Sequence, residues 1–248
     1  MSRVDRTHVL GVPVDRIDFD GAVEHVEELI DRGEKRQCVL AMNPEKVMRL
    51  RGDRALFEFV SGAALLIPDG YGVVLAAKLL GLPGLRLVTG VDLMVRLAGL
   101  AHKRGFTVFL FGASEEANAG AAAFLAREMP GLKIAGRRNG YVEEGREEDV
   151  VALINQCRPD MLFVALGSPR QEQWMSRWLP QLDVRICQGV GGTFDVLSGV
   201  ARRAPRAVQR LRLEWLFRLL ADPRRAKRQA ALPRFAAAVL RERLKTLR

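Results

Sequence analysis

Short runs of apolar residues recur along the chain, and stretches with a helical spacing of apolar and polar positions lie between them. The clearest run, residues 161–166, holds six consecutive apolar residues, which is typical of a strand buried on both faces of a parallel sheet. Similar runs predict strands at 38–42, 64–67, 107–111, 133–136 and 185–190, and helical patterns at 21–32, 72–77, 91–103, 115–129 and 147–157. This alternation predicts an α/β fold, with a Rossmann-like parallel sheet and helices on both of its faces.

Polar or glycine-containing turns follow several of the predicted strands. Asn43 is expected to cap one helix, Asp69 lies in a Pro-Asp-Gly turn, and Ser168 is expected to cap a helix with Pro169 in its first turn. The carboxyl ends of parallel strands share one edge of the sheet, where open α/β folds bind ligands and helix N-termini attract anions. We therefore expect these turns to lie along one edge.

The N-terminal part is predicted less sharply. Residues 7–14 indicate a short edge strand that Pro13 interrupts, and Asp20 is expected to cap the helix that follows. Asp18 and Asp20 also have the acid-x-acid spacing with which many sugar-nucleotide enzymes hold a divalent metal ion. No buried strand precedes the pair, so the spacing favours a helix cap and its neighbour over a metal site.

Charge divides the chain near residue 200. Residues 201–248 contain fifteen Lys or Arg and three Asp or Glu, a net charge of +12, whereas residues 1–200 carry −2. The tail also has apolar positions at helical spacing in 206–220 and 236–247. We therefore predict an α/β domain over 1–200 and a basic amphipathic helical appendage over 201–248, which suits an anionic membrane surface.

Patterns that the sequence lacks disfavour some partners and indicate the compartment. Nucleic acid is the competing partner of a basic tail, but there is no RNP, zinc-finger or helix-turn-helix pattern, so no nucleic acid is expected. No apolar run is long enough to span a membrane, and the N-terminus lacks the apolar core of a signal peptide, which predicts a cytosolic protein. The three cysteines are read as buried thiols in a reducing compartment.

Several classes of chemistry are disfavoured. The segment 189–195 departs from the dinucleotide fingerprint because Phe194 stands in place of its last glycine, which disfavours a Rossmann-type oxidoreductase. The chain has no GK[ST] phosphate loop, and its histidines fall in no metalloprotease or triad-like context. Carboxylates, amides and arginines are therefore left to carry any reaction.

A set of motifs in chain order resembles the WecG/TagA/CpsF glycosyltransferases, family 26. The resemblance covers nearly the whole chain, and its tail motif adds to it. The matching positions are Asn43-x-Glu45, Pro68-Asp69-Gly70, Gly90-x-Asp92-Leu93, Phe111-Gly112, Gly140-Tyr141, Gly167-Ser168-Pro169-Arg170-Gln171-Glu172, Gly189-Val190-Gly191-Gly192-Thr193-Phe194-Asp195, Arg203-Ala204-Pro205 and Leu213-Glu214-Trp215-Leu216-x-Arg218-Leu219-Leu220-x-x-Pro223-x-Arg225-x-x-Arg228.

The resemblance implies an activity. Members of the family transfer a sugar from a UDP donor to an undecaprenyl-diphosphate-linked sugar at the inner face of the bacterial membrane, with inversion and without a metal or other cofactor. An N-acetylmannosamine-type donor is the main expectation and UDP-glucose the alternative within the family. A non-enzymatic nucleotide- or nucleic-acid-binding module is the alternative from another class, and a homo-oligomer stays open.

The resemblance also implies roles for individual residues. Asp69 would be the general base, and Asn43 and Gln171 would hold acceptor or donor hydroxyls. Three arginines of the tail would bind the lipid diphosphate: Arg218, Arg225 and Arg228. The UDP-sugar would be bound by Gly112, Tyr141, Gly167, Ser168, Arg170, Gly191, Gly192 and Asp195.

Two positions depart from the family pattern. Ala41 stands where some members have a threonine, which removes a hydroxyl two residues before Asn43. Leu87 replaces an arginine, and Arg86 lies one position earlier, where its guanidinium could point elsewhere.

Overall fold

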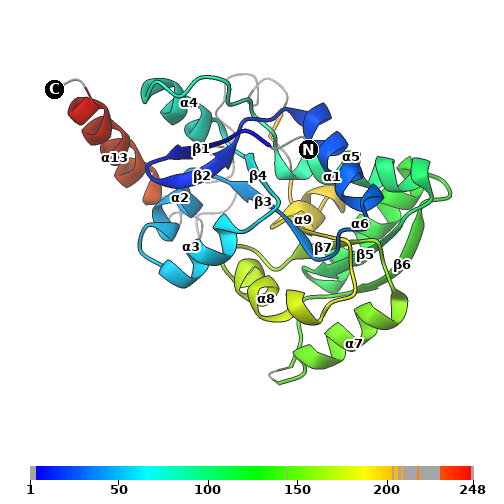
Figure 1. Cartoon of the computed structure of the whole chain (residues 1–248). Coiled ribbons are helices and arrows are strands. Elements are labelled where there is room, and N and C mark those ends of the chain that lie inside the picture. The colour runs from blue at the N-terminus through cyan, green and yellow to red at the C-terminus, as the bar shows by residue number, and fades with distance from the viewer. Residues whose placement is uncertain are drawn as a thin grey trace.

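A computed structural model describes residues 4–143, 145–202, 204, 205, 208, 217 and 230–246. Its centre is a sheet of six parallel strands in the order β4-β3-β8-β7-β5-β6 (Figure 1). This confirms the predicted Rossmann-like α/β fold. The strands are β3 (Gln37–Met42), β4 (Leu65–Pro68), β5 (Thr107–Gly112), β6 (Lys133–Arg138), β7 (Met161–Ala165) and β8 (Ile186–Gly189).

Helices cover both faces of the sheet because successive strand residues point to opposite sides. Phe109 and Phe111 of β5 pack into one apolar cluster, and Val108 and Leu110 pack into the other. The first cluster lies under α2 (Pro44–Leu50), α3 (Arg54–Ser61), α4 (Tyr71–Leu79), α7 (Glu147–Cys157) and α8 (Arg170–Trp178). The second lies under α1 (Phe19–Asp31), α5 (Gly90–Arg104), α6 (Glu115–Glu128) and α9 (Thr193–Leu197).

The N-terminal segment is a hairpin, so the prediction of one strand broken by Pro13 is wrong. Strands β1 (Arg6–Val9) and β2 (Val12–Asp15) pair antiparallel, with Pro13 opposite His8. The turn between them uses positive φ at Leu10 (54°) and Gly11 (81°), a geometry that suits the twist of a hairpin. Pro13 is tolerated because this small sheet has two strands and each of them is an edge.

The first helix begins two residues earlier than predicted. Asp18, not Asp20, is its N-cap, and its carboxylate accepts a 3.0 Å hydrogen bond from the backbone N–H of Gly21. Asp18 also pairs with Arg86 at 2.8 Å, and Asp20 pairs with Arg96 at 2.7 Å. Both carboxylates therefore have arginine partners, and the cap belongs to Asp18 and not to the predicted Asp20.

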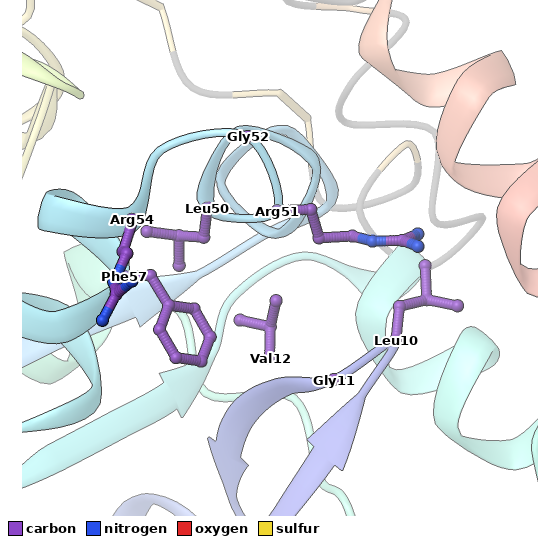
Figure 2. Close-up of a pocket in the computed structure, with 8 residues that line it drawn as sticks. All are labelled: Leu10, Gly11, Val12, Leu50, Arg51, Gly52, Arg54 and Phe57. Atoms are coloured by element: carbon purple, nitrogen blue, oxygen red, sulfur yellow. The ribbon is translucent and has the colours of Figure 1, made fainter.

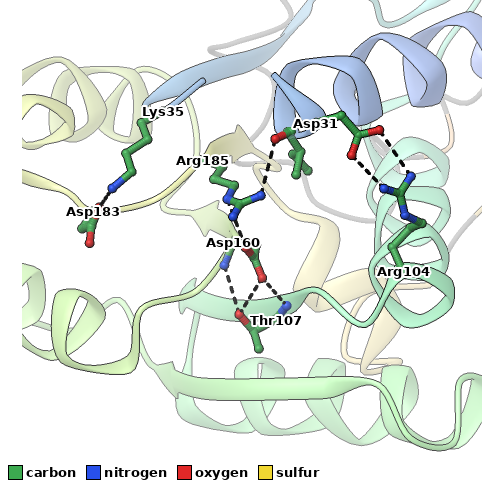
Figure 3. A network of polar contacts seen from close by, with 8 residues as sticks. Asp31, Lys35, Arg104, Thr107, Asp160, Asp183 and Arg185 are labelled. Atoms are coloured by element: carbon green, nitrogen blue, oxygen red, sulfur yellow. Dashed lines mark hydrogen bonds and ion pairs between the residues drawn. The ribbon is translucent and has the colours of Figure 1, made fainter. Parts of the chain in front are cut away.

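The amino-terminal edge of the sheet is closed by polar contacts (Figure 3). The Asp160 carboxylate accepts from the Thr107 backbone N–H at 2.8 Å and pairs with Arg185 at 3.3 Å. Lys35 and Asp183 pair beside them at 2.5 Å. These charged groups satisfy one another, and each candidate active-site residue that the structure describes lies at the opposite edge.

The described end of the tail is α13 (Ala231–Thr246), which packs beside α2 and α4 at one end of the molecule (Figure 1). Phe235 and Val239 are buried there, while Leu240 and Leu244 are exposed. Most of the predicted appendage, including 209–216 and 218–229, lies outside the described residues, so the domain boundary near residue 200 stays a prediction. Among the helices that are described, none is long and apolar enough to cross a bilayer.

Candidate active site

Asn43 follows β3 directly and begins α2 at the carboxyl edge of the sheet. Its side-chain oxygen accepts a 2.8 Å hydrogen bond from the backbone N–H of Lys46, and Pro44 fills the first helical position, where a missing N–H costs nothing. The predicted cap is therefore confirmed. The helix start holds the Asn43 amide group at the edge where we expected it.

Asp69 lies beside Asn43, in the turn that follows β4. A Cβ atom added to Gly70 would lie 4.0 Å from the Cβ of Asn43, and one added to Gly72 would lie only 2.7 Å from the Cγ of Pro44. The two turns are therefore packed together, and Gly70, at φ 91°, has a backbone conformation that favours glycine. Two predicted site residues that are 26 positions apart share one surface.

The Asp69 carboxylate faces the start of α5. A Cβ atom on Gly90, the first residue of that helix, would lie 3.7 Å from Oδ2 of Asp69. The N-terminal end of a helix carries a partial positive charge, which stabilises a nearby carboxylate. The site thus holds an acidic group at a fixed place beside Asn43.

The turn after β7 is built differently from its prediction. Helix α8 has Pro169 at its N-cap with no side-chain cap hydrogen bond, so Ser168 does not cap it, and the Ser168–Pro169 peptide bond is cis. Gly167 has φ 74°, and a Cβ atom added there would meet nothing within 4 Å. The carbonyl of Gly167 instead accepts from the backbone N–H of Gln171 at 2.8 Å.

The turn after β8 is bound to the start of α8 by Gln171. The Gln171 side-chain oxygen accepts a 2.9 Å hydrogen bond from the backbone N–H of Gly191, which has φ 56° and open space beside it. A Cβ atom on Gly189 would lie 2.8 Å from Nε2 of Gln171, so the glycine leaves room for this side chain. The structure therefore joins the two glycine turns through one buried amide.

A buried ion pair that the sequence analysis missed lies beneath these turns. Lys46 Nζ is 2.6 Å from Oε1 of Glu172, and the two side chains are 3% and 0% exposed. Burial, the largest single effect, disfavours the charged form of Glu172. The charge of Lys46 and the hydrogen bonds from Lys46, Gln171 and Ser168 together outweigh burial and hold the pKa of the Glu172 carboxyl below its usual value. The two residues are 126 positions apart, so no local pattern signals their contact.

The remaining nucleotide-site candidates lie at or after the ends of β5, β6 and β8, at the same edge. Gly112 approaches the backbone of β7 so closely that an added Cβ would be 2.5 Å from the carbonyl of Ala165, which gives this glycine a packing role. Tyr141 follows β6 and is 78% exposed. Gly192 and Asp195 lie at the start of α9. Their roles toward a nucleotide stay predictions.

The described candidates form a row along one edge. Strands are about 4.8 Å apart, so the Asp69 turn on β4 and the Gly167 turn on β7, three strands away, are separated by about 14 Å. Asn43 and the Gly191 turn lie between them, whereas Tyr141 lies two strands beyond β7. Arg218, Arg225 and Arg228 lie outside the described residues.

Among the hollows on the part of the chain that the structure describes, two concern the sheet domain. One of about 250 Å³ borders the site and is lined by Phe111, Gly140, Leu166, Arg170 and Trp174 with five other residues. The other, of about 450 Å³, lies between the β1–β2 turn and the α2–α3 junction, with Phe57 and Arg51 among its lining residues (Figure 2). In the part of the chain that the structure describes, no three His, Cys, Asp or Glu side chains are grouped to hold a metal. Metal independence stays a prediction.

Comparisons with known proteins point to one family. Residues 7–248 match the Glycosyl transferase WecG/TagA/CpsF family. A Bacillus spizizenii protein named N-acetylglucosaminyldiphosphoundecaprenol N-acetyl-beta-D-mannosaminyltransferase is 35% identical over 234 residues, which cover 92% of this chain and 90% of the relative. Proteins of the same name from Bacillus subtilis and Staphylococcus aureus (strain MRSA252) are 36% and 31% identical; the matches cover 82% and 94% of this chain, and 79% and 92% of those relatives.

Proposed function

The chain belongs to the WecG/TagA/CpsF family of glycosyltransferases, and from this premise we propose that it transfers N-acetylmannosamine from UDP to an undecaprenyl-diphosphate-linked N-acetylglucosamine. The single observation that carries the proposal is the packing of the Asp69 turn against Asn43 at the same edge as the Gly167 and Gly191 turns. The carboxyl edge of the sheet thus carries an acid group after the edge strand β4 and open glycine turns after the central strands β8 and β7. Such a product belongs to the assembly of a cell-envelope polysaccharide.

The acceptor binds on the Asp69 side in this proposal. Its hydroxyl attacks the anomeric carbon of the donor, Asp69 takes the hydroxyl proton, and the bond to UDP breaks with its electron pair leaving on the diphosphate. A displacement of this kind inverts the anomeric centre. Asn43 orients a substrate hydroxyl beside the base. This role suits its position, because the Asn43 Cβ lies 4.0 Å from a Cβ atom added to Gly70, the residue after Asp69.

The donor diphosphate binds on the side of the glycine turns. Gly167 and Gly191 leave open space where a side chain would otherwise stand, so phosphate oxygens can approach backbone N–H groups there. Arg170, exposed at the start of α8, supplies a guanidinium for the leaving charge. Gly192 and Asp195, beside the Gly191 turn, and Tyr141, further along the edge, would contact the nucleoside. The tail arginines would add positive charge.

The protein works at the cytoplasmic face of an anionic membrane in this proposal, because the acceptor is a lipid. Helices α4 and α13 pack beside each other, and both expose leucines: Leu75 (41%), Leu79 (44%), Leu240 (58%) and Leu244 (63%). Helix α13 also carries Arg234, Arg241, Arg243 and Lys245. Apolar side chains mixed with basic ones suit a membrane interface.

The decisive experiment incubates the purified protein with a short-chain polyprenyl-diphosphate-N-acetylglucosamine and, separately, with UDP-N-acetylmannosamine, its uronic acid, UDP-N-acetylglucosamine and UDP-glucose. Product mass identifies the sugar transferred. Gain of one N-acetylhexosamine from the N-acetylmannosamine donor supports the proposal. Transfer of a uronic acid or glucose instead would reject the donor, and no product with any donor would reject the function.

A further inference from the structure

Four hydrogen bonds form a continuous chain beneath the candidate site. The Asn43 side-chain oxygen accepts from the Lys46 backbone N–H at 2.8 Å, and Lys46 Nζ donates to Glu172 Oε1 at 2.6 Å. The same Glu172 oxygen accepts from Gln171 Nε2 at 2.9 Å, and Gln171 Oε1 accepts from the Gly191 N–H at 2.9 Å. The chain therefore connects the carboxyl ends of β3, β7 and β8, three neighbouring strands.

The ionic part of this chain is not explained by stability. Lys46 and Glu172 are almost completely shielded from water, and moving both charges out of water costs about as much as their attraction returns. An apolar pair of similar volume would pack there at least as well. A role for the two charges therefore has to come from the groups that they contact.

What the carboxylate does is to set the direction of Gln171. An ionised carboxylate only accepts hydrogen bonds, so it faces the amide NH₂ group of Gln171 and leaves the amide oxygen pointing at the Gly191 N–H. The Lys46 ammonium keeps Glu172 ionised and lies on the helix whose cap is Asn43. Reversal of the Gln171 amide would set two N–H groups against each other at Gly191.

We infer that Lys46 and Glu172 are positioning residues for the transfer reaction. They fix the orientation of the Gln171 amide, and this amide holds the Gly191 turn in place relative to Asn43. The inference rests on the proposed function for its meaning in catalysis. The pair touches no substrate, so it affects the relative placement of the two sides more than the binding at either side. A misplacement of about 1 Å lowers a reaction rate about a hundredfold.

The first test replaces the pair by apolar residues, Lys46→Met with Glu172→Leu. We expect kcat to fall at least tenfold, the Kd for UDP to change less than threefold, and the melting temperature to stay within a few degrees of the wild type. The matched control is Lys35→Met with Asp183→Leu, an ion pair at the amino-terminal edge, which should change none of the three.

The second test exchanges the charges, Lys46→Glu with Glu172→Lys. The exchanged pair keeps an ion pair, but the ammonium that now stands at position 172 can only donate, so it turns the amide oxygen of Gln171 toward itself and away from Gly191. We expect kcat to fall at least tenfold again. Recovery of wild-type kcat by the exchanged pair would show that only the ion pair matters and would overturn the inference, as would full activity of the apolar pair.

A readout without substrate separates this inference from the proposed function. Hydrogen exchange in the peptide covering 188–194 should be faster in both double variants than in the wild type and the control. If the wild-type protein makes no product, the proposed function is rejected. The hydrogen-exchange rate of residues 188–194 then tests the positioning role by itself, and an unchanged rate in the double variants overturns that role. Should the apolar pair fail to fold, the exchanged pair decides by the same measurements.

Discussion

The backbone N–H of Asp69 donates a 2.9 Å hydrogen bond to the carbonyl oxygen of Met42, the residue immediately before Asn43. The turn after the edge strand β4 is thereby fixed to the end of its neighbour β3. A base in this position keeps its relation to Asn43 without help from a bound ligand. Replacement of the carboxylate should therefore change chemistry and leave the surrounding backbone in place.

Asp69→Asn should lower kcat by about 10²–10⁴-fold, the usual contribution of a general base. The Asn side chain keeps the volume and the turn, so the Kd for UDP and the melting temperature should stay at their wild-type values. Product formation, calorimetric UDP binding and thermal unfolding measure the three quantities. Asp20→Asn, which removes an exposed carboxylate on α1, is the control, and wild-type turnover by Asp69→Asn would remove Asp69 from the mechanism.

Alanine at either glycine turn should weaken UDP binding. Gly167→Ala and Gly191→Ala meet no neighbour within 4 Å, but each places a side chain at a positive φ, which costs about 1 kcal/mol of folding stability. Because the added methyl also fills the proposed phosphate position, both should weaken UDP binding at least tenfold. Denaturant unfolding and calorimetry measure the two effects.

Gly33→Ala is the matched control for these variants. Gly33 follows α1 with φ 71° and open space around it, away from the site. It should lose the same stability as the site variants and leave UDP binding unchanged. Equal UDP affinity in all three variants would mean that these turns do not hold the diphosphate.

Stability should depend on pH through Glu172. The folded protein holds the pKa of this carboxyl below its unfolded value of about 4.3, so the pair's contribution is present above that pH and is lost as the pH falls through the folded pKa. Glu172→Gln leaves the Lys46 ammonium buried without its partner and should cost about 3 kcal/mol at pH 7.

The difference in free energy of unfolding between the wild type and Glu172→Gln should therefore become smaller as the pH falls below about 4.3. Urea unfolding of both proteins between pH 3 and 7 measures it. A gap of constant size across this range would show that the Glu172 carboxyl does not titrate with a lowered pKa.

Local patterns predicted the parts of this fold that local chemistry decides. The apolar run of β7 and the amphipathic spacing of α7 appear in the structure within a residue of their predicted bounds. Asn43 with Pro44 was recognisable as a helix start because capping and proline preferences act within four residues. The strand ends that carry Asp69 and Gly167 followed from the same patterns.

The parts that depend on distant contacts could not be read from the sequence. Asp18 caps α1 in place of Asp20, and it also pairs with Arg86, 68 positions away. Serine is a residue type that is common at helix N-caps, but the backbone after Gly167 does not place Ser168 at the N-cap of α8. Lys46 and Glu172 each lie in a helix of ordinary composition, and only the sheet order brings them together.

Membrane association should depend on the exposed leucines of α13. Leu240→Gln with Leu244→Gln removes two apolar side chains that are 58% and 63% exposed, so folding should be unaffected. If each contributes about 1 kcal/mol at a lipid interface, association with anionic vesicles should fall at least tenfold. Vesicle co-sedimentation measures this. Val200→Gln, an exposed apolar residue on neither α4 nor α13, is the control.

The positive charge of the tail, known from its sequence alone, should contribute to membrane association and to turnover. Arg225→Glu with Arg228→Glu changes the charge of the tail by −4, and each basic residue near an anionic surface contributes about 1 kcal/mol. Both vesicle association and turnover with the lipid acceptor should fall. A water-soluble acceptor with a very short chain separates the two effects: if turnover with it also falls, the arginines act on the diphosphate as well as on the membrane. Unchanged association and turnover would make this part of the tail an ordinary solvated surface.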